Sequence, residues 1–425
     1  MPSWRKKAQI YLSHKSDHET NKTQTYTSLT AQHPTPASAS TKIRQAILAT
    51  ALVDALGGPP EFHKRFSFPL VTTMKPNNNF SLPPGVWTDD TSMTLCLARS
   101  LATFTPRAID GHARVGGFDE KHQLDAYTSW YREGTLSAIG RCFDIGGTIR
   151  RALHIYEKHA QPDQSIDDAL KHIADELYDE NCAGGGSLMR VLPIGLAYWR
   201  DEGLAMEYGR RSSRTTHPNA MCQEACEVWT RAIVQIMRVS TAKDYHGSYT
   251  KLDVIRSFAE FPYTNDKLRD ALALPRGIPP LPAMKEDHEA YYRTHHPIVQ
   301  LIAKTEAESL SKKGGFSKII PKAAELPSTG YVLHILVAAL YCFLATDNFE
   351  EGAILAVNLG DDADTVGAVY AGLAGCWYAE NEGDETHGMF GTDRVREWRS
   401  KLVKRELVEE VAEELAKYSA ELSRG

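Results

Sequence analysis

The sequence predicts an all-α fold. Apolar residues recur at helical spacing in the long segments, as Met93, Leu97, Leu101 and Phe104 do. No segment shows the strict alternation that is typical of a β-strand, and no motif repeats at a fixed period. Two acidic clusters, WTDDT and GDDADT, each lead directly into an apolar helical segment.

The composition is that of a globular protein, with 425 residues, 42% hydrophobic and 24% charged, and a formal net charge of -6. The acidic balance argues against bulk nucleic-acid binding. No apolar run approaches the roughly 20 residues that span a bilayer, so no membrane partner is expected. Seven dispersed cysteines indicate reduced thiols and an intracellular protein, cytoplasmic or nuclear. The basic start, acid-poor as far as Asp17, is also compatible with mitochondrial targeting.

Two parts of the chain differ in composition. Residues 1–40 are rich in Ser, Thr and Pro and nearly lack large apolar residues after Leu29, so we predict a disordered tail. Residues 41–425 are predicted to form one catalytic domain, which we expect to be monomeric. Its first helix is expected to start with Thr41 as the N-cap and to run into VDALGGPPE, where two glycines and two prolines place Glu61 on a loop.

The later acidic cluster carries Asp361, Asp362 and Asp364 behind Gly360, with Thr365 next to them. Three carboxylates in four residues repel one another and need a positive partner. A divalent cation is the natural candidate, because hard cations bind carboxylate and hydroxyl oxygens. The alternative is that the aspartates cap a helix, which explains one of them well and three poorly.

The helix after this cluster carries Gly367, Ala371 and Gly375 at four-residue spacing. An interior glycine costs a helix about 1 kcal/mol. The spacing therefore predicts that another helix packs closely against this one.

The earlier acidic cluster contains Thr88, Asp89 and Asp90, again directly before an amphipathic helix. Capping by Asp90 or Thr91 is the simple explanation. If the two clusters meet, however, they offer about six oxygen ligands, which suit one or two Mg²⁺ or Mn²⁺ ions and do not suit a soft metal.

Two glycine-rich segments could bind phosphate through backbone amides. They are DIGGT, with Asp144, Gly146 and Gly147, and AGGGS, with Gly184, Gly185, Gly186 and Ser187. An ordinary helix start capped by Asp144 and close approach of another helix are the alternatives. His217, before Pro218, is either structural or a hydrogen-bond donor to phosphate or ribose.

Other segments are less informative. Residues 107–124 are interpreted as a loop insertion before a helix near Asp125–Glu133, and residues 240–330 give no clear pattern, with His295 and His296 predicted at the surface. Apolar helices are expected after Gly330 and over Phe349–Asn358, and the last thirty residues are predicted to form a charged amphipathic helix.

In this order over residues 41–390, VDALGGPPEF, WTDDTSM, FDIGGT, AGGGSLMR, TTH and GDDADTVGAVYAGLAG resemble the motifs of the ADP-ribosylglycohydrolase family, of the dinitrogenase-reductase-activating glycohydrolase type. The resemblance implies a compact orthogonal multi-helix bundle, with a binuclear Mg²⁺ or Mn²⁺ centre at loop–helix junctions. The implied metal ligands are Thr88, Asp89, Asp90, Asp362, Asp364 and Thr365. Asp361 occupies a position that is often Gly and is not expected to be a ligand.

The resemblance also implies hydrolysis at the anomeric carbon of ADP-ribose conjugates, either modified protein or a small conjugate. The implied catalytic residues are Glu61, on a mobile loop that covers the metals, Asp89, Asp90 and Asp362. The implied substrate-binding residues are Asp144, Gly146, Gly147, Gly184, Gly185, Gly186, Ser187, Met189 and His217.

Two departures from the family pattern are Val53, where Gly is usual, and Gly185, where Asn is usual. A non-catalytic ADP-ribose-binding protein of the same fold therefore stays an alternative. A prenyl-diphosphate enzyme fits less well, because its Asp-Asp-x-x-Asp motif would require an acid where Thr365 stands. The sequence does not define the linkage cleaved, which depends on rim loops such as residues 107–124 and 275–297.

Overall fold

The structure is a computed structural model that describes residues 27–105, 116–160, 165–242, 247–310, 320–381 and 388–422. Within these ranges the regular elements are α-helices, α2 to α18, and three short 3₁₀-helices. The β-structure of the same ranges is limited to two isolated bridges, Asn77 with Leu82 and Gly184 with Tyr331. The prediction of an all-α fold is confirmed.

The helices have the following bounds in chain order: α2 (Ala39–Gly57), α3 (Asp89–Thr103), α4 (Glu120–Glu133), α5 (Gly147–His159), α6 (Ile166–Leu177), α7 (Leu192–Ala197), α8 (Glu202–Arg214), α9 (Ala220–Ser240), α10 (Lys251–Ala259), α11 (Asp266–Leu272), α12 (His288–His295), α13 (Pro297–Leu310), α14 (Val332–Leu344), α15 (Phe349–Val357), α16 (Ala363–Tyr378), α17 (Asp393–Lys401) and α18 (Arg405–Glu421). The 3₁₀-helices are η1 (Glu180–Cys182), η2 (Gly185–Ser187) and η3 (Lys285–Asp287).

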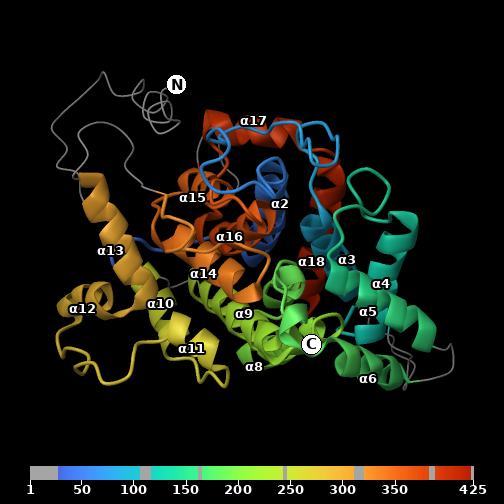
Figure 1. Cartoon of the computed structure of the whole chain (residues 1–425), viewed down its shortest axis with the longest axis horizontal. Coiled ribbons are helices and arrows are strands. Elements are labelled where there is room, and N and C mark those ends of the chain that lie inside the picture. Colours follow the sequence, from blue (N-terminus) through green and yellow to red (C-terminus); the bar gives the residue numbers. More distant parts are fainter. Residues whose placement is uncertain are drawn as a thin grey trace.

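Helices α2 and α16 pack together at the centre of the molecule (Figure 1). A Cβ added at Gly375 would lie 2.5 Å from Ala46 Cα, and one at Gly367 would lie 2.9 Å from Val53 Cγ1. The glycines therefore allow the backbones to approach, which confirms the predicted close helix contact. Val53, one of the two departures named in the sequence analysis, packs against Gly367.

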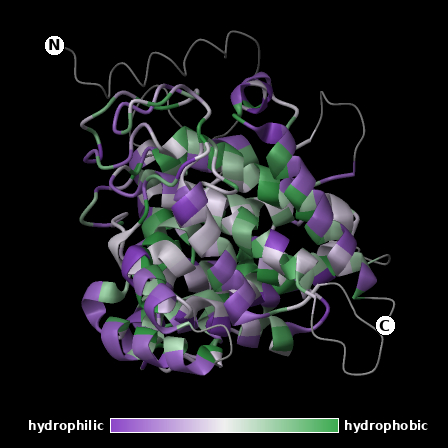
Figure 2. Cartoon of the chain, turned by 90° about the vertical axis from the view of Figure 1, so that its right-hand side faces the viewer, coloured by the Kyte–Doolittle hydropathy of each residue, from purple (hydrophilic) through white to green (hydrophobic). Residues whose placement is uncertain are grey.

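The other helices surround this pair. In Figure 1, α3 to α6 lie on one side of α16 and α10 to α13 lie on the other. Figure 2 shows apolar residues concentrated between the helices and polar residues on their outer faces. None of the helices in the described ranges combines the length and the apolarity that crossing a membrane requires.

The N-terminal boundary differs from the prediction. Ser38, and not Thr41, caps α2, and its side chain accepts a hydrogen bond from Thr41 N. Residues 27–38 contact the folded part, since Leu29 is fully buried and its N–H donates to Glu289 Oε1 at 3.0 Å. The rest of the predicted tail, residues 1–26, lies outside the described residues.

The helix predicted near Asp125–Glu133 is confirmed as α4, which ends at Glu133 and starts earlier, at Glu120. Two other local predictions were wrong. The predicted C-terminal helix is two helices, α17 and α18. The chain turns between them because Lys404 has a left-handed φ of 50° and the N–H of Val403 donates to Gly85 O. His296 is buried rather than exposed, with Nε2 2.9 Å from Leu272 O. Most of the predicted loop insertion, residues 106–115, lies outside the described residues.

Candidate active site

The C-terminal end of α2 brings the two acidic loops together. The carboxylate of Asp54 accepts hydrogen bonds from the backbone N–H groups of Thr88 and Thr91, both at 3.0 Å, and from both threonine hydroxyls. One turn later, a Cβ added at Gly57 would lie 2.5 Å from Asp364 Cα. Helix α2 therefore holds the start of α3 and the start of α16 side by side. Asp54 was absent from the predicted site, although a carboxylate inside the apolar VDALGG segment was a usable signal.

The acidic loops also contact each other directly. Thr365 Oγ1 donates to Asp90 Oδ2 at 3.2 Å, and Thr88 Oγ1 lies 3.3 Å from Asp364 Oδ2. The N-cap residues of α3 and α16 are Thr88 and Asp362, and neither uses its side chain in a capping hydrogen bond. Simple helix capping therefore does not account for these side chains.

Glu61 lies beside the two acidic loops. We call the carboxylates of Glu61, Asp89, Asp90, Asp144, Asp362 and Asp364 the acidic wall of the site. Its loop is fixed to the acidic turn by two backbone hydrogen bonds, Phe62 N to Asp361 O at 2.7 Å and Asp361 N to His63 O at 2.8 Å. Glu61 is 4% exposed. Carboxylate oxygens of Glu61, Asp144 and Asp364 all lie within 4.8 Å of one another, a spacing that could hold a metal ion.

Burial dominates the electrostatics of the wall. It raises the pKa of Asp144 to about 7 and the pKa of Asp362 to about 6. Burial and the neighbouring carboxylates hold the pKa values of further groups well above their usual range: Glu61, Asp89, Asp90 and Asp364.

Protein cations do not balance this charge within the described residues. The lining includes Lys64, which is largely exposed and pairs with Asp361 at 2.9 Å, and Arg150, which donates to Ile145 O. Three buried carboxylate oxygens there accept no hydrogen bond: Glu61 Oε2, Asp90 Oδ1 and Asp144 Oδ2. Clustered carboxylate and hydroxyl oxygens with free acceptor positions fit hard divalent cations such as Mg²⁺ and Mn²⁺.

Opposite the acidic wall lie Gly146, Gly147, Gly184, Gly185 and Gly186, which we call the glycine wall. Gly146 caps α5 and Gly147 is its first residue. A Cβ added at Gly147 would meet nothing within 4 Å, so this helix start faces open space. At η2, Gly186 lies between Ile149 and His217, where an added Cβ would approach both at under 3 Å.

A buried arginine holds the glycine loop in place. Arg190 is fully buried and donates to Gly186 O, to Ser212 O at 3.2 Å, to Thr216 Oγ1 at 2.8 Å and to Tyr127 OH at 3.0 Å. Arg190 was not predicted as a site residue, although a charged residue inside the apolar SLMRVLPIG run was a signal. Its partners come from distant segments, which the sequence does not connect.

His217 lines the cleft as a neutral side chain. Burial and the charge of Arg190 lower its pKa to about 3. Its Nδ1 lies 2.9 Å from Thr216 Oγ1, and its ring packs against Gly184 and Gly186. A neutral imidazole in this position can donate a hydrogen bond to a ligand or accept one from it.

The two walls enclose a cleft of about 870 Å³. The predicted site residues that line it are Glu61, Asp89, Asp90, Asp144, Gly146, Gly147, Gly184, Gly185, Gly186, Met189, His217, Asp362, Asp364 and Thr365. Thr88 lies just behind them. Ser187 was predicted to bind substrate, but its hydroxyl accepts a hydrogen bond from Ser213 Oγ at 2.9 Å in the core behind the loop.

Gly185, the other departure named in the sequence analysis, has a specific neighbour. A Cβ at this position would overlap with Cδ1 of Ile335 from α14. Ile335 is fully buried and fills the space beside the loop. The side chain of Ile335 therefore occupies the space that a Cβ at position 185 would need.

Fold and site together define an all-helical protein in which carboxylates at helix starts face a glycine-rich wall across one cleft. Residues 35–424 match the family model described as ADP-ribosylglycohydrolase, and the chain belongs to this family.

Several known proteins are similar to the chain. The "ADP-ribosylarginine hydrolase Tri1" of Serratia proteamaculans is 29% identical over 376 residues, 88% of this chain and 78% of that protein. The protein of the same name from Pseudomonas putida is 28% identical over 90% of this chain and 79% of its own length. The "ADP-ribosyl-[dinitrogen reductase] glycohydrolase" of Rhodospirillum rubrum is 23% identical over 79% of this chain and 85% of its own. A solved structure titled "ADP-ribosylglycohydrolase-related protein complex" is 31% identical, with a TM-score of 0.55 over 90% of this chain and 99% of that one.

Proposed function

We propose that the protein is a metal-dependent hydrolase that cleaves the glycosidic bond at the anomeric carbon of ADP-ribose conjugates and releases ADP-ribose. The observation that carries this proposal is the acidic wall, where buried carboxylates crowd together. The cations of the described lining are engaged elsewhere, Lys64 with Asp361 and Arg150 with Ile145 O. Such crowding is unfavourable unless cations bind there. Membership of the ADP-ribosylglycohydrolase family supports ADP-ribose conjugates as the class of substrate.

Thr88, Asp89, Asp90, Asp362, Asp364 and Thr365 would hold two Mg²⁺ or Mn²⁺ ions. When bound, these ions polarise water and lower its pKa. Glu61, buried against Asp144 and Asp364, would hold the attacking water. Once bound cations offset the repulsion that raises its pKa, it would take the proton of that water.

The other residues of the cleft bind and orient the conjugate. Backbone amides at Gly146 and Gly147, at the positive end of α5, suit the diphosphate. The neutral imidazole of His217 supplies a hydrogen bond without adding charge. The acidic wall stabilises the positive charge that develops on the ribose in an oxocarbenium-like transition state.

For the linkage, we propose ADP-ribosyl-arginine. Two relatives, 29% and 28% identical over 88% and 90% of this chain, carry the name ADP-ribosylarginine hydrolase. A positively charged guanidinium leaving group is also compatible with a cleft whose described lining is mainly acidic on one side.

The test is ADP-ribose release from three purified conjugates, ADP-ribosyl-arginine, ADP-ribosyl-serine and poly-ADP-ribose, with Mg²⁺, with Mn²⁺ and with EDTA. We expect release from the arginine conjugate that EDTA abolishes and added metal restores. Release from another conjugate alone would overturn the arginine assignment but would still support the proposal that the protein is a hydrolase. Binding of ADP-ribose without release from any conjugate would overturn the hydrolase and favour a non-catalytic ADP-ribose-binding protein.

A further inference from the structure

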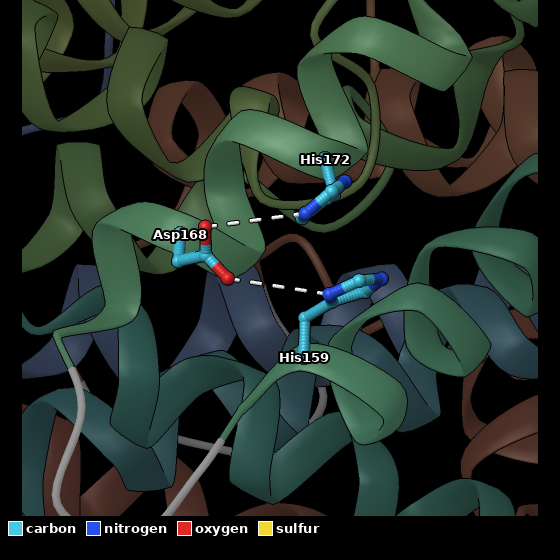
Figure 3. Close-up of side chains that lie close together, drawn as sticks. All are labelled: His159, Asp168 and His172. Atoms are coloured by element: carbon cyan, nitrogen blue, oxygen red, sulfur yellow. Dashed lines mark ion pairs between the residues drawn. The ribbon is translucent and has the colours of Figure 1, made fainter.

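A second group of possible metal ligands lies outside the cleft, between α5 and α6. His159 is the last residue of α5, and Asp168 and His172 lie one turn apart on α6. Figure 3 shows the three side chains directed toward a common space between the two helices. One ligand atom from each of them lies within 4.8 Å of the others.

The distances suit an ion between the side chains better than direct hydrogen bonds. His159 Nδ1 lies 4.0 Å from Asp168 Oδ2, and His172 Nε2 lies 3.9 Å from Asp168 Oδ1. A hydrogen bond would require about 2.7–3.2 Å. Two ligand atoms on a tetrahedral Zn²⁺, with bonds of about 2.0–2.1 Å, lie about 3.4 Å apart. Each nitrogen–oxygen pair therefore needs to close by about half an ångström to bind one ion.

The ligand types select a different metal from that of the cleft. Two imidazoles and one carboxylate suit Zn²⁺ and similar transition metals, whereas the cleft offers oxygen ligands that suit Mg²⁺ or Mn²⁺. The side chains of His159, Asp168 and His172 are 20%, 54% and 40% exposed. An ion could therefore enter from solvent and keep a water molecule as its fourth ligand.

The two imidazole rings are stacked, with centroids 3.7 Å apart and planes 22° apart. Binding of one ion by both rings requires His172, the more exposed of the two, to turn so that its Nε2 points to the same position as His159 Nδ1.

We propose that His159, Asp168 and His172 form a binding site for Zn²⁺ or a similar transition metal that joins the C-terminal end of α5 to α6. The opposite end of α5 carries Gly147 in the cleft, 12 residues and about 18 Å away along the helix. The ion would therefore fix the position of the helix that presents the glycine wall, without touching the cleft.

The test measures metal binding to the full chain by titration with Co²⁺, followed by its visible absorption, and by counting bound Zn²⁺ after dialysis. The variants are His159→Gln and His172→Gln, with Asp168→Asn as a milder change. The matched control is His154→Gln, which changes another histidine of α5, exposed and 3.0 Å from Tyr131 OH. Melting temperatures in EDTA show whether each variant is folded.

We expect the wild type and His154→Gln to bind one Zn²⁺ more than His159→Gln and His172→Gln, and to show a Co²⁺ absorption that these two variants lack. Asp168→Asn should weaken Co²⁺ binding. Asp364→Asn, which changes only the cleft, should keep the absorption, so the outcome is independent of the proposed hydrolase. Equal Zn²⁺ counts and equal Co²⁺ spectra in the wild type, His159→Gln and His172→Gln would overturn the proposal.

Discussion

The two walls of the cleft differ in how far the protein itself provides hydrogen-bond partners for their polar groups. In the glycine wall, the loop at η2 is held by the protein itself, because Arg190 donates to Gly186 O and Gly185 N donates to Gly330 O. The acidic wall is left unsatisfied, with carboxylate oxygens of Glu61, Asp90 and Asp144 buried and without a hydrogen-bond partner. One wall is therefore a rigid support, and the other is complete only with a ligand that the chain does not supply.

This difference separates structural from functional polar groups. Buried polar groups that serve the fold are normally hydrogen-bonded. Groups that are buried and left without partners store unfavourable energy, and such strain concentrates at functional sites. Variants of the two walls should therefore differ in kind: changes in the acidic wall should reduce activity, and changes behind the glycine wall should reduce stability.

The largest effect is expected for Asp364→Asn. Loss of this buried carboxylate should lower the rate of ADP-ribose release by about 10³-fold, because charge stabilisation at the reacting centre is lost. The same change should raise the melting temperature of the metal-free protein, since it removes one of several repelling charges. Enzyme assays and thermal unfolding in EDTA measure the two effects.

The control for this prediction is Asp361→Asn in the same turn. Asp361 pairs with the exposed Lys64, so its replacement should change stability by less than about 1 kcal/mol and leave release nearly unchanged. Equal losses of activity in Asp361→Asn and Asp364→Asn would contradict the assignment of only Asp364 to the reacting centre.

Arg190→Met should have the largest effect on stability. It removes the charged donor of several buried hydrogen bonds and leaves Ser212 O and Thr216 Oγ1 without that partner, at a cost of about 3 kcal/mol or more in the free energy of unfolding. Urea unfolding measures this cost. Arg44→Met, at a half-exposed arginine paired with Glu413, should cost less than about 1 kcal/mol. Similar losses in both variants would show that Arg190 does not support the loop.

Gly185→Asn sharpens the comparison within the glycine wall. The new side chain would overlap with Ile335 and should cost about 1–3 kcal/mol in the free energy of unfolding. The double variant with Ile335→Ala should recover part of this loss, with a coupling energy of about 1 kcal/mol or more. Strictly additive effects in urea unfolding would show that the cost of Gly185→Asn does not come from overlap with Ile335.

The two walls should also respond to pH with opposite sign. Asp144 and Asp362 have folded-state pKa values of about 7 and about 6, above the usual value of 3.8. Their stabilising contribution to the metal-free protein is present below about pH 4 and is lost as the pH rises toward 7. His217 has a folded-state pKa of about 3, below the usual 6.5, so its contribution is present above pH 6.5 and is lost as the pH falls toward 3.

Thermal unfolding across this pH range tests the prediction. In EDTA, stability should fall as the pH rises from about 5 to 7, and Asp364→Asn should weaken this trend. Mg²⁺ should reverse it, because ions bind the ionised carboxylates. His217→Gln should reduce the loss at low pH. A metal-free wild type whose stability rises steadily between pH 5 and 7 would show that the carboxylates are not strained.

The sequence predicts the acidic wall better than the support behind it. Asp89, Asp90, Asp362 and Asp364 stand in short motifs next to helix starts, so local spacing is enough to find them. Asp54 and Arg190 act through partners 34 to 37 and 22 to 63 residues away, which depend on how the helices pack.

The same reason explains the other differences. Ser187 was predicted to face the ligand, and only its contact with Ser213 shows that it faces the core. His296 has a polar sequence context, but the packing of α12 and α13 buries it against Leu272 O. Periodicity identified the helices, whereas the direction of single side chains at their ends required the tertiary structure.

The most direct test of the acidic wall is the binding of Mn²⁺, measured by electron paramagnetic resonance, together with ADP-ribose release by the same samples. We expect the wild type to bind two Mn²⁺ ions with spin coupling between them, and Asp364→Asn to lose both the coupling and the activity. Release of ADP-ribose that persists in EDTA, or Mn²⁺ binding that Asp364→Asn leaves unchanged, would contradict the assignment of these carboxylates to a binuclear metal centre.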